Sequence, residues 1–306
     1  MEPMPVGRVT TKDDLGSTVV QLKQILVATD FSSGARVALD CALAMAKRFE
    51  SRVHLVHVIS PGVAQYVAAE SSEEAVRNAR SFAGVALKRL IQDSGCPELI
   101  RGEILSDGRV WPMLQEYALQ HRIDLVALGT HGKNSTKKQL LGSVAEEIFR
   151  VAELPILTVG ERNVTGGRTA SEAGNILYAT NFKPHAEHAA SMAYRMEQAH
   201  GTKLRVLHVV EEQDQNVKGG NDLVRDFMTQ RLRKGMPSSC AGRCEPEFRV
   251  RFGDVVQEIL KETTEESTDI LVLGLRSGAD AMGQLPSATA YKLVCQSPCP
   301  VLTTRT

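Results

Sequence analysis

Short apolar runs alternate along the chain with longer segments whose apolar residues recur at helical spacing. The runs near residues 24–29, 53–59 and 124–129 are continuous and rich in Val, Ile and Leu. Such runs are typical of strands that are buried on both faces of a parallel sheet. Residues 34–49 follow two serines that can cap a helix, and their apolar positions lie three and four residues apart. The pattern predicts an α/β fold in which helices join parallel strands.

The same pattern occurs twice in the chain. Residues 24–31 read QILVATDF and residues 175–182 read NILYATNF, which places the second copy 151 residues further on. Residues 123–129 read IDLVALG and residues 268–274 read TDILVLG, at a spacing of 145 residues. Self-similarity over this length indicates a tandem repeat of one domain. We expect a lead-in, a first domain, a linker and a second domain at residues 1–21, 22–160, 161–173 and 174–306.

Composition and charge argue against two classes of binding partner, nucleic acids and membranes. The 306 residues include 36 basic and 36 acidic side chains, so the net charge is zero, and only 5% are aromatic. Nucleic-acid binders usually carry a basic excess and aromatic stacking platforms, so we expect no nucleic-acid partner. No apolar run approaches the roughly 18 residues of a membrane span, and the first residues lack a signal-peptide core. We therefore expect no membrane partner and a cytoplasmic location.

A glycine-rich segment follows the fourth predicted strand of the first copy. From Gly129 to Val144 it reads GTHGKNSTKKQLLGSV. Glycines let the backbone approach a ligand closely, and a helix that begins near Gly142 and Ser143 would present free N–H groups to an anion. Three lysines lie in the same segment. The segment predicts a phosphate-binding loop, with simple turn-forming glycines as the alternative.

This loop resembles the ATP-binding motif of the universal stress protein family. Residues 25–32, 55–59 and 154–159 resemble the first, second and fifth strands of that family. The resemblance covers nearly all of 22–160 and, more weakly, 174–305, and it points to the tandem two-domain form and the ATP-binding branch. It implies two tandem doubly wound domains, each a five-stranded parallel sheet of order 3-2-1-4-5 with helices on both faces.

The resemblance also implies a nucleotide site. In this strand order the first and fourth strands flank the switch point where ligands bind, so Asp30 would face a cleft shared with Gly129. The predicted nucleotide-binding residues are Ala28, Thr29, Asp30, Val58, Leu128, Gly129, His131, Gly132, Gly142, Ser143 and Val144. Asp30 is also a candidate ligand for Mg or Mn held with ATP. The alternatives are a local turn for Asp30, plain core for Val58 and simple solvent exposure for His131.

The second copy departs from this motif. When the two copies are aligned on Gly274, Ser277 and Ser287 replace the second and third glycines, and Asn181 replaces Asp30. The three lysines of the first loop are also missing. We therefore expect the second domain to bind nucleotide poorly or not at all.

The cysteines and matched histidines raise further hypotheses. Cys240 with Cys244, and Cys295 with Cys299, have metal-like spacing, but the 3-2-1-4-5 order places the two pairs at opposite edges of one sheet. We expect reduced thiols. His57 and its repeat partner His208 are expected to be structural.

No catalytic signature accompanies the loop. A Walker loop, a dinucleotide fingerprint, a nucleophile elbow and a zinc-protease motif are all absent from the sequence. The leading hypothesis is an ATP-binding stress-response protein that acts as a nucleotide-dependent switch or scaffold, with no catalytic residues. A slow Mg- or Mn-dependent ATPase or autophosphorylating enzyme, and a purely structural role, are the alternatives. Edge strands favour pairing, so we expect a homodimer or an intramolecular pseudo-dimer of the two copies.

Overall fold

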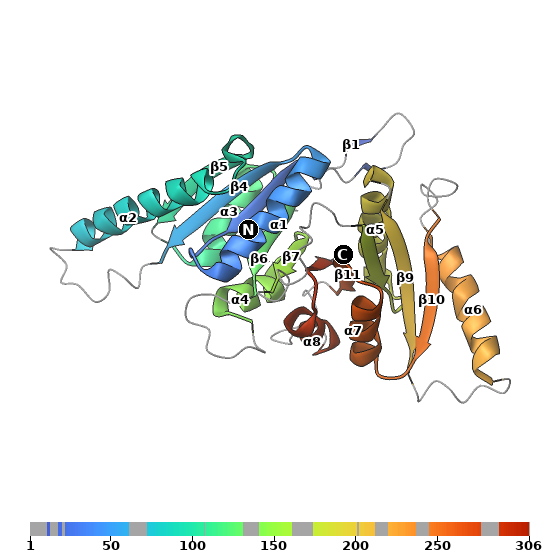
Figure 1. Cartoon of the computed structure of the whole chain (residues 1–306). Coiled ribbons are helices and arrows are strands. Elements are labelled where there is room, and N and C mark those ends of the chain that lie inside the picture. The colour runs from blue at the N-terminus through green and yellow to red at the C-terminus, as the bar shows by residue number, and fades with distance from the viewer. Residues whose placement is uncertain are drawn as a thin grey trace, which may run out of the picture.

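The structure is a computed structural model, shown in Figure 1. It describes residues 11–12, 18–19, 22–60, 72–106, 108–130, 141–160, 174–200, 202–211, 220–236, 245–276 and 288–305. Two short strands, β1 (Thr11–Lys12) and β2 (Thr18–Val19), pair antiparallel ahead of the first domain.

Strands and helices alternate through the first half as the apolar pattern predicts. The elements are β3 (Gln24–Ala28), α1 (Ser33–Phe49), β4 (Arg52–Ile59), α2 (Ser72–Gln92), the 3-10 helix η3 (Pro97–Leu99), β5 (Ile100–Ser106), α3 (Val110–Gln120), β6 (Leu125–Gly129), α4 (Ser143–Val151) and β7 (Ile156–Val159). Ser32 caps α1, because its Oγ accepts a hydrogen bond from the N–H of Ala35 at 3.2 Å.

The second half repeats the order. Its elements are β8 (Asn175–Ala179), the 3-10 helix η6 (Pro184–Ala186), α5 (Glu187–His200), β9 (Lys203–Val210), α6 (Gly220–Lys234), β10 (Glu247–Phe252), α7 (Val255–Glu265), β11 (Ile270–Leu275), α8 (Ala288–Gln296) and β12 (Val301–Arg305). The α/β fold with parallel strands is confirmed. None of the helices in the described ranges is long and apolar enough to cross a membrane.

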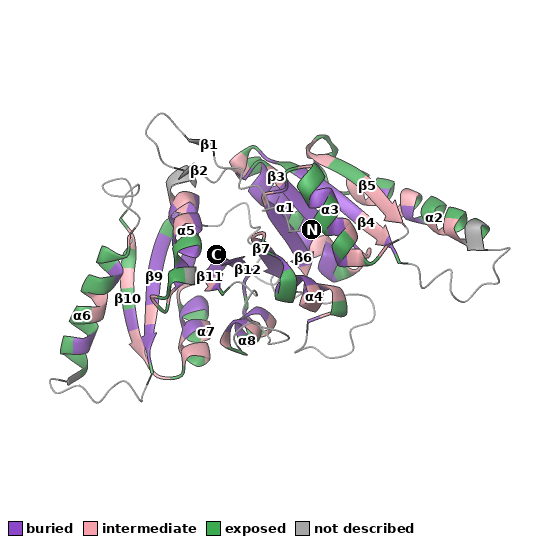
Figure 2. Ribbon diagram, turned by 180° about the vertical axis from the view of Figure 1, so that it is seen from behind, coloured by how far each residue is buried: buried purple, intermediate pink, exposed green. Residues whose placement is uncertain are grey.

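The two halves form a single ten-stranded sheet, to which each half contributes five parallel strands in an order that corresponds to 3-2-1-4-5. The strand order is β10-β9-β8-β11-β12-β7-β6-β3-β4-β5. All neighbours are parallel except β12 and β7, which pair antiparallel at the centre, where Figure 2 shows them side by side. A fifth strand at the edge of either half would expose unpaired N–H and C=O groups, and pairing β7 with β12 satisfies both edges. The copies are thus joined within one chain.

Two apolar layers sandwich the sheet. Helices α1, α2, α5 and α6 supply buried residues to one cluster, for example Leu39, Leu87, Tyr194 and Leu232. Helices α3, α4, α7 and α8 supply the other, which includes Phe149. The inner strands, such as β3, β6 and β7, are mostly buried, in purple in Figure 2, which explains their continuous apolar sequences. Each half therefore presents the carboxyl ends of its strands at one rim, between two helical layers.

Candidate functional site

The turn after β3 is held by its own side chains. The N–H of Phe31 donates to Thr29 Oγ1 at 3.1 Å, and the N–H of Ser32 donates to Asp30 Oδ1 at 3.0 Å. Phe31 has a positive φ of 61°. The Asp30 carboxylate therefore forms an Asx turn that leads into the cap of α1, so the local-turn role that the sequence offers as an alternative is present.

Gly129 brings the end of β6 against the start of α1. A Cβ at this position would lie 2.6 Å from the carbonyl carbon of Gly34 and 2.7 Å from its oxygen, so no side chain fits. Strands β3 and β6 are neighbours in the sheet, with Val27 opposite Ala127. The turn at Asp30 and the end of β6 therefore share the switch point between the first and fourth strands of this half.

The two ends of the glycine-rich loop are tied together. Thr130 is buried, its N–H donates to Val159 O at 2.9 Å, and its carbonyl accepts from the N–H of Gly142 at 2.8 Å. His131 and Gly132 lie outside the described residues, as do the three lysines of the loop. The hydrogen bond between Gly142 and Thr130 places the start of α4 directly beside the end of β6.

The amino end of α4 is suited to an anion. The helix begins at Ser143 behind Gly142, which makes no side-chain capping bond. The first N–H groups of a helix have no acceptor within it, and the helix dipole adds partial positive charge at this end. Ser143 is exposed, so its hydroxyl is accessible beside those groups. This geometry can accept a phosphate group.

Four predicted apolar residues gather on one face of the sheet. Ala28, Val58 and Val144 are half-buried and pack against the cluster that α3 and α4 cover, and Leu128 is buried within it. Leu105 belongs beside them, because it pairs with Val58 in register and packs against the same cluster. Sequence reasoning missed Leu105, although its place in the short apolar pair Ile104-Leu105, just ahead of Gly108, is a signal that could have found it.

His57 contacts the turn that follows β3. Its Nδ1 lies 2.8 Å from the carbonyl oxygen of Thr29, and its ring centroid lies 4.5 Å from that of Phe31. In the second half His208 Nδ1 lies 2.9 Å from Thr180 O. A carbonyl oxygen only accepts, so Nδ1 carries the proton in both rings. The matched contacts give both histidines a structural role.

The turn after β8 copies the turn after β3 with an amide in place of the carboxylate. Lys183 N–H donates to Asn181 Oδ1 at 3.2 Å, and Phe182 N–H donates to Thr180 Oγ1 at 3.1 Å. Phe182 also has a positive φ, of 60°. Ser277 and Ser287 lie outside the described residues. The turn itself therefore does not need the negative charge that Asp30 carries.

A different polar cluster lies near the amino ends of the strands. His54 is buried, with Nδ1 2.9 Å from Tyr117 Oη and Nε2 2.8 Å from Gln24 Oε1. Burial, with nearby His121 second, lowers the pKa of His54 to about 4. Its repeat partner in the second half is Arg205. Both lie at the far end of their strands from the Asp30 turn, so this cluster is structural.

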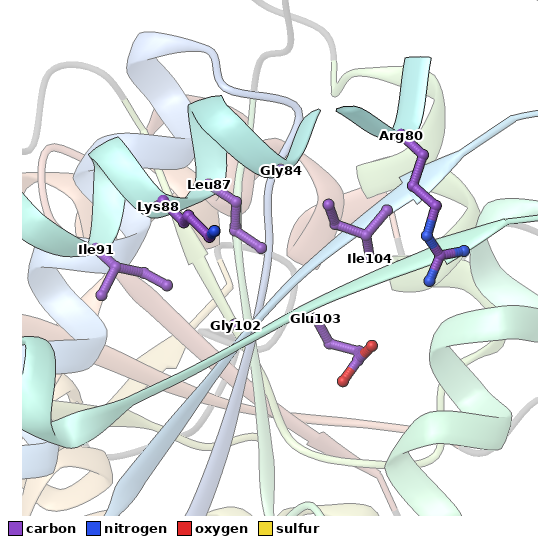
Figure 3. Close-up of a pocket in the computed structure, with 8 residues that line it drawn as sticks. All are labelled: Arg80, Gly84, Leu87, Lys88, Ile91, Gly102, Glu103 and Ile104. Carbon is purple, nitrogen blue, oxygen red and sulfur yellow. The ribbon is translucent and has the colours of Figure 1, made fainter. Parts of the chain in front are cut away.

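A cavity of about 290 Å³ lies between α2 and β5, shown in Figure 3. Its lining residues are Arg80, Gly84, Leu87, Lys88, Ile91, Gly102, Glu103 and Ile104. None of them is a predicted nucleotide-binding residue. The Arg80 guanidinium donates to Ser106 Oγ at 3.2 Å, so its charge is partly engaged within the chain.

The described part of the chain contains free thiols but no cluster of metal-ligating side chains. It contains no group of three or more His, Cys, Asp or Glu side chains that could hold a metal ion. Asp30 could still share Mg²⁺ with a nucleotide, because such an ion usually takes one or two carboxylates, phosphate oxygens and waters. The free cysteines within these ranges are Cys41, Cys96, Cys295 and Cys299. Cys240 and Cys244 lie outside the described residues.

Known proteins match both halves of the chain. The model of the Universal stress protein family matches residues 21–160 and 172–305. Universal stress protein MJ0531 of Methanocaldococcus jannaschii is 30% identical over 141 residues, which are 45% of this chain and 81% of that relative. A universal stress protein of Thermus aquaticus is 29% identical over 136 residues, 42% of this chain and 97% of that relative.

A solved structure matches both halves together. The crystal structure of a universal stress protein from Archaeoglobus fulgidus DSM 4304 superimposes with a TM-score of 0.66 at 20% identity. The match covers 93% of this chain and 99% of the other. At this identity the likeness shows a shared fold.

Proposed function

The chain belongs to the universal stress protein family, and we propose that it is an ATP-binding stress-response protein that acts as a nucleotide-dependent switch or scaffold. The first domain, residues 22–160, holds the nucleotide, and the second, residues 174–306, has a degenerate site. The observation that carries the proposal is the uncapped amino end of α4, which the hydrogen bond from Gly142 N–H to Thr130 O holds beside the end of β6.

In the proposed site, separate groups of residues bind the base, the phosphates and the metal ion. The half-buried Ala28, Val58 and Leu105 form an apolar wall for the base, next to Thr29. The N–H groups at the start of α4, with the Ser143 hydroxyl, receive the phosphates. His131 and Gly132 stay nucleotide-binding candidates on the sequence motif alone. Asp30 lies where a carboxylate can share Mg²⁺ or Mn²⁺ with the phosphates.

Binding is favoured over hydrolysis because none of the catalytic motifs sought in the sequence is present. His57 reaches the Asp30 turn, where its Nδ1–H donates to the carbonyl of Thr29 at 2.8 Å. His208 makes the same contact in the half that has lost the glycine-rich motif, which favours a structural role for this pair. We therefore propose a binding role, in the cytoplasm, with ATP as ligand and neither nucleic acid nor membrane as partner. A homodimer would need surfaces other than β7 and β12, which are already paired.

The test is to count nucleotides. Equilibrium dialysis of the full chain against labelled ATP with Mg²⁺ is expected to give one ATP per chain. Gly142→Val is expected to weaken binding by about 100-fold or more, because the side chain would fill the space next to the phosphate. The backbone of Gly142 has φ −61° and ψ 154°, which valine adopts readily, so the variant should fold.

Gly142→Ala is the matched control and is expected to lose less affinity, because its side chain is smaller. Thermal unfolding of each nucleotide-free variant checks that the fold is kept. Absence of bound ATP in the wild type, with no ATP-dependent rise in melting temperature, would refute the proposal. Two ATP molecules per chain would refute the asymmetry between the domains.

A further inference from the structure

The second domain reaches the start of α4, the helix that the first domain would use for phosphate. The N–H of Leu141, the residue before the Gly142 cap, donates to the hydroxyl oxygen of Tyr291 at 3.4 Å. Tyr291 belongs to α8, and its ring packs edge-on against Phe149 of α4 with centroids 6.3 Å apart. The residue before the cap of α4 and the last turn of α4 therefore both contact the second domain.

The second domain also holds the end of α4. Arg305, at the end of β12, is 8% exposed. Its Nη2 donates to the carbonyls of Phe149 at 2.5 Å and Arg150 at 3.1 Å, and its Nη1 donates to Arg276 O at 2.9 Å. The last carbonyls of a helix lack partners within it, and the dipole favours a cation there. Tyr291 thus contacts the residue before α4 and Phe149, while Arg305 binds the last carbonyls of α4. We call this pair of residues the α4 clamp.

The contact between β7 and β12, where the two halves meet, is symmetric. Thr158 Oγ1 donates to Val301 O at 3.1 Å, and its repeat partner Thr303 donates through Oγ1 to Ile156 O at 3.4 Å. Antiparallel pairing of β7 with β12 relates the two halves by an approximate two-fold axis. A contact made from one half to the other could therefore have a counterpart in the opposite direction.

The side chains at the corresponding positions of the first half cannot make the same contacts as the α4 clamp. At the repeat spacing of 145 residues, Glu146 occupies the position of Tyr291 and Gly160 occupies the position of Arg305. Gly160 has no side chain to reach α8, and Glu146 forms an ion pair with Arg150 of its own helix at 3.9 Å. In the described residues, the contacts of the Tyr291 hydroxyl and the Arg305 guanidinium therefore run from the second domain to the first. It is directed to the half that keeps the glycine-rich loop.

We propose that Tyr291 and Arg305 are positioning residues by which the second domain preorganises the nucleotide site of the first. The inference rests on the proposed function, because it assumes that α4 receives phosphate. Fixing both ends of α4 before binding removes part of the ordering cost and raises affinity. Coupling of this kind is reciprocal, so bound ATP stabilises the contact of α4 with α8 and β12. The second domain then serves as the part that senses nucleotide.

The test compares ATP affinity in full-length variants by equilibrium dialysis. Tyr291→Phe keeps the ring against Phe149 and removes only the hydroxyl, and it is expected to weaken ATP binding about 3-fold. Arg305→Lys keeps the charge and loses the forked donors, and about a 10-fold loss is expected. Lys292→Ala and Gln296→Ala, exposed positions on the same helix, are the controls and are expected to keep wild-type affinity.

Hydrogen exchange separates positioning from general stability. In the nucleotide-free protein, Tyr291→Phe is expected to speed exchange of the Leu141 and Gly142 amides while amides in α5 keep their wild-type rates. In the wild type, ATP is expected to slow exchange in α8 and β12. Faster exchange throughout the variant would mean a merely structural residue and would overturn the inference.

The outcomes separate the two proposals. If the wild type binds ATP and both clamp variants bind it with unchanged affinity, the clamp is overturned while the proposed function stands. If the wild type binds no ATP, both fall. Weakened binding in both variants, with local exchange at Leu141 and unchanged controls, supports the clamp.

Discussion

The turns after β3 and β8 have the same geometry but different charge. Each uses a threonine hydroxyl and an Asx side chain to accept backbone N–H groups, and each places a phenylalanine at a φ near 60° beside a histidine ring. Asp30 carries a carboxylate where Asn181 carries an amide, and the turn is unchanged. Both halves form the same turn with either side chain, so the turn itself does not require a negative charge at residue 30.

A second contrast lies at the amino ends of the strands. The first half buries a neutral cluster, with His54 between Tyr117 and Gln24. The second half has Arg205 at that position, paired with Glu247 at 3.2 Å and Glu266 at 3.0 Å. The two halves thus keep one backbone plan while one interior is neutral and the other is ionic. Their stabilities should respond differently to mutation and to pH.

The largest expected difference concerns the ionic interior. Arg251 pairs with Glu258 at 3.3 Å, with Glu265 at 2.6 Å and with Glu262, whose side chain is 2% exposed. Arg251→Ala would leave the Glu262 carboxylate buried without its cation, so we expect about 3–5 kcal/mol loss of unfolding free energy. A control at the end of the third strand of the first half, Ser106→Ala, removes no ion pair and is expected to cost under about 0.5 kcal/mol.

Urea denaturation of both variants measures this difference. The transition should shift for the second domain in Arg251→Ala and stay near wild type in Ser106→Ala. Equal shifts in the two variants would contradict the contrast between an ionic and a neutral interior.

The next effect concerns pH in the first half. The pKa of His54 falls from an ordinary 6.5 to about 4 on burial, so between these values the unfolded chain binds more protons than the folded one. Stability from the neutral ring is complete above pH 6.5 and is lost as pH falls towards 4. We expect the first domain to lose about 2 kcal/mol between pH 7 and pH 5.

Denaturation at the two pH values, in wild type and in His54→Gln, tests the assignment. Glutamine can bond both Tyr117 and Gln24 without titrating, so the variant is expected to lose most of this pH slope. A slope that persists in His54→Gln would assign the effect to other groups.

The last prediction tests whether the charge of Asp30 contributes to ATP binding independently of the shape of its turn. Asp30→Asn copies the second half into the first, so melting temperature should stay near wild type. ATP affinity with Mg²⁺ is expected to fall about 10-fold, because the carboxylate no longer shares the metal. Without Mg²⁺ the two proteins should bind ATP almost equally in dialysis.

Asn181→Asp is the matched control in the other half. It restores the charge without restoring the loop and is expected to leave the number of ATP molecules per chain unchanged. A 10-fold loss in Asp30→Asn both with and without Mg²⁺ would refute the metal role of Asp30.

Local features of the site were accessible from sequence. The apolar runs around β3, β4 and β6, the serine cap of α1 and the start of α4 behind Gly142 follow from periodicity, capping and glycine placement within a few residues. Leu105 and Tyr291 were missed, because each reaches the site through register or packing with a strand or helix distant in the chain.

The order of the residues is enough to predict the repeat, the alternation of strands and helices, and the loss of the second glycine-rich motif. These depend on residue order and on which faces must be buried. Tertiary structure alone decided that β7 pairs with β12 to make one sheet, and that Tyr291 and Arg305 grip α4 from the other half. The apolar pattern shows that a strand is buried, but it does not specify which edge the strand will pair with. Backbone hydrogen bonds can join any two exposed edges, so that choice depends on how the two assembled halves meet in space.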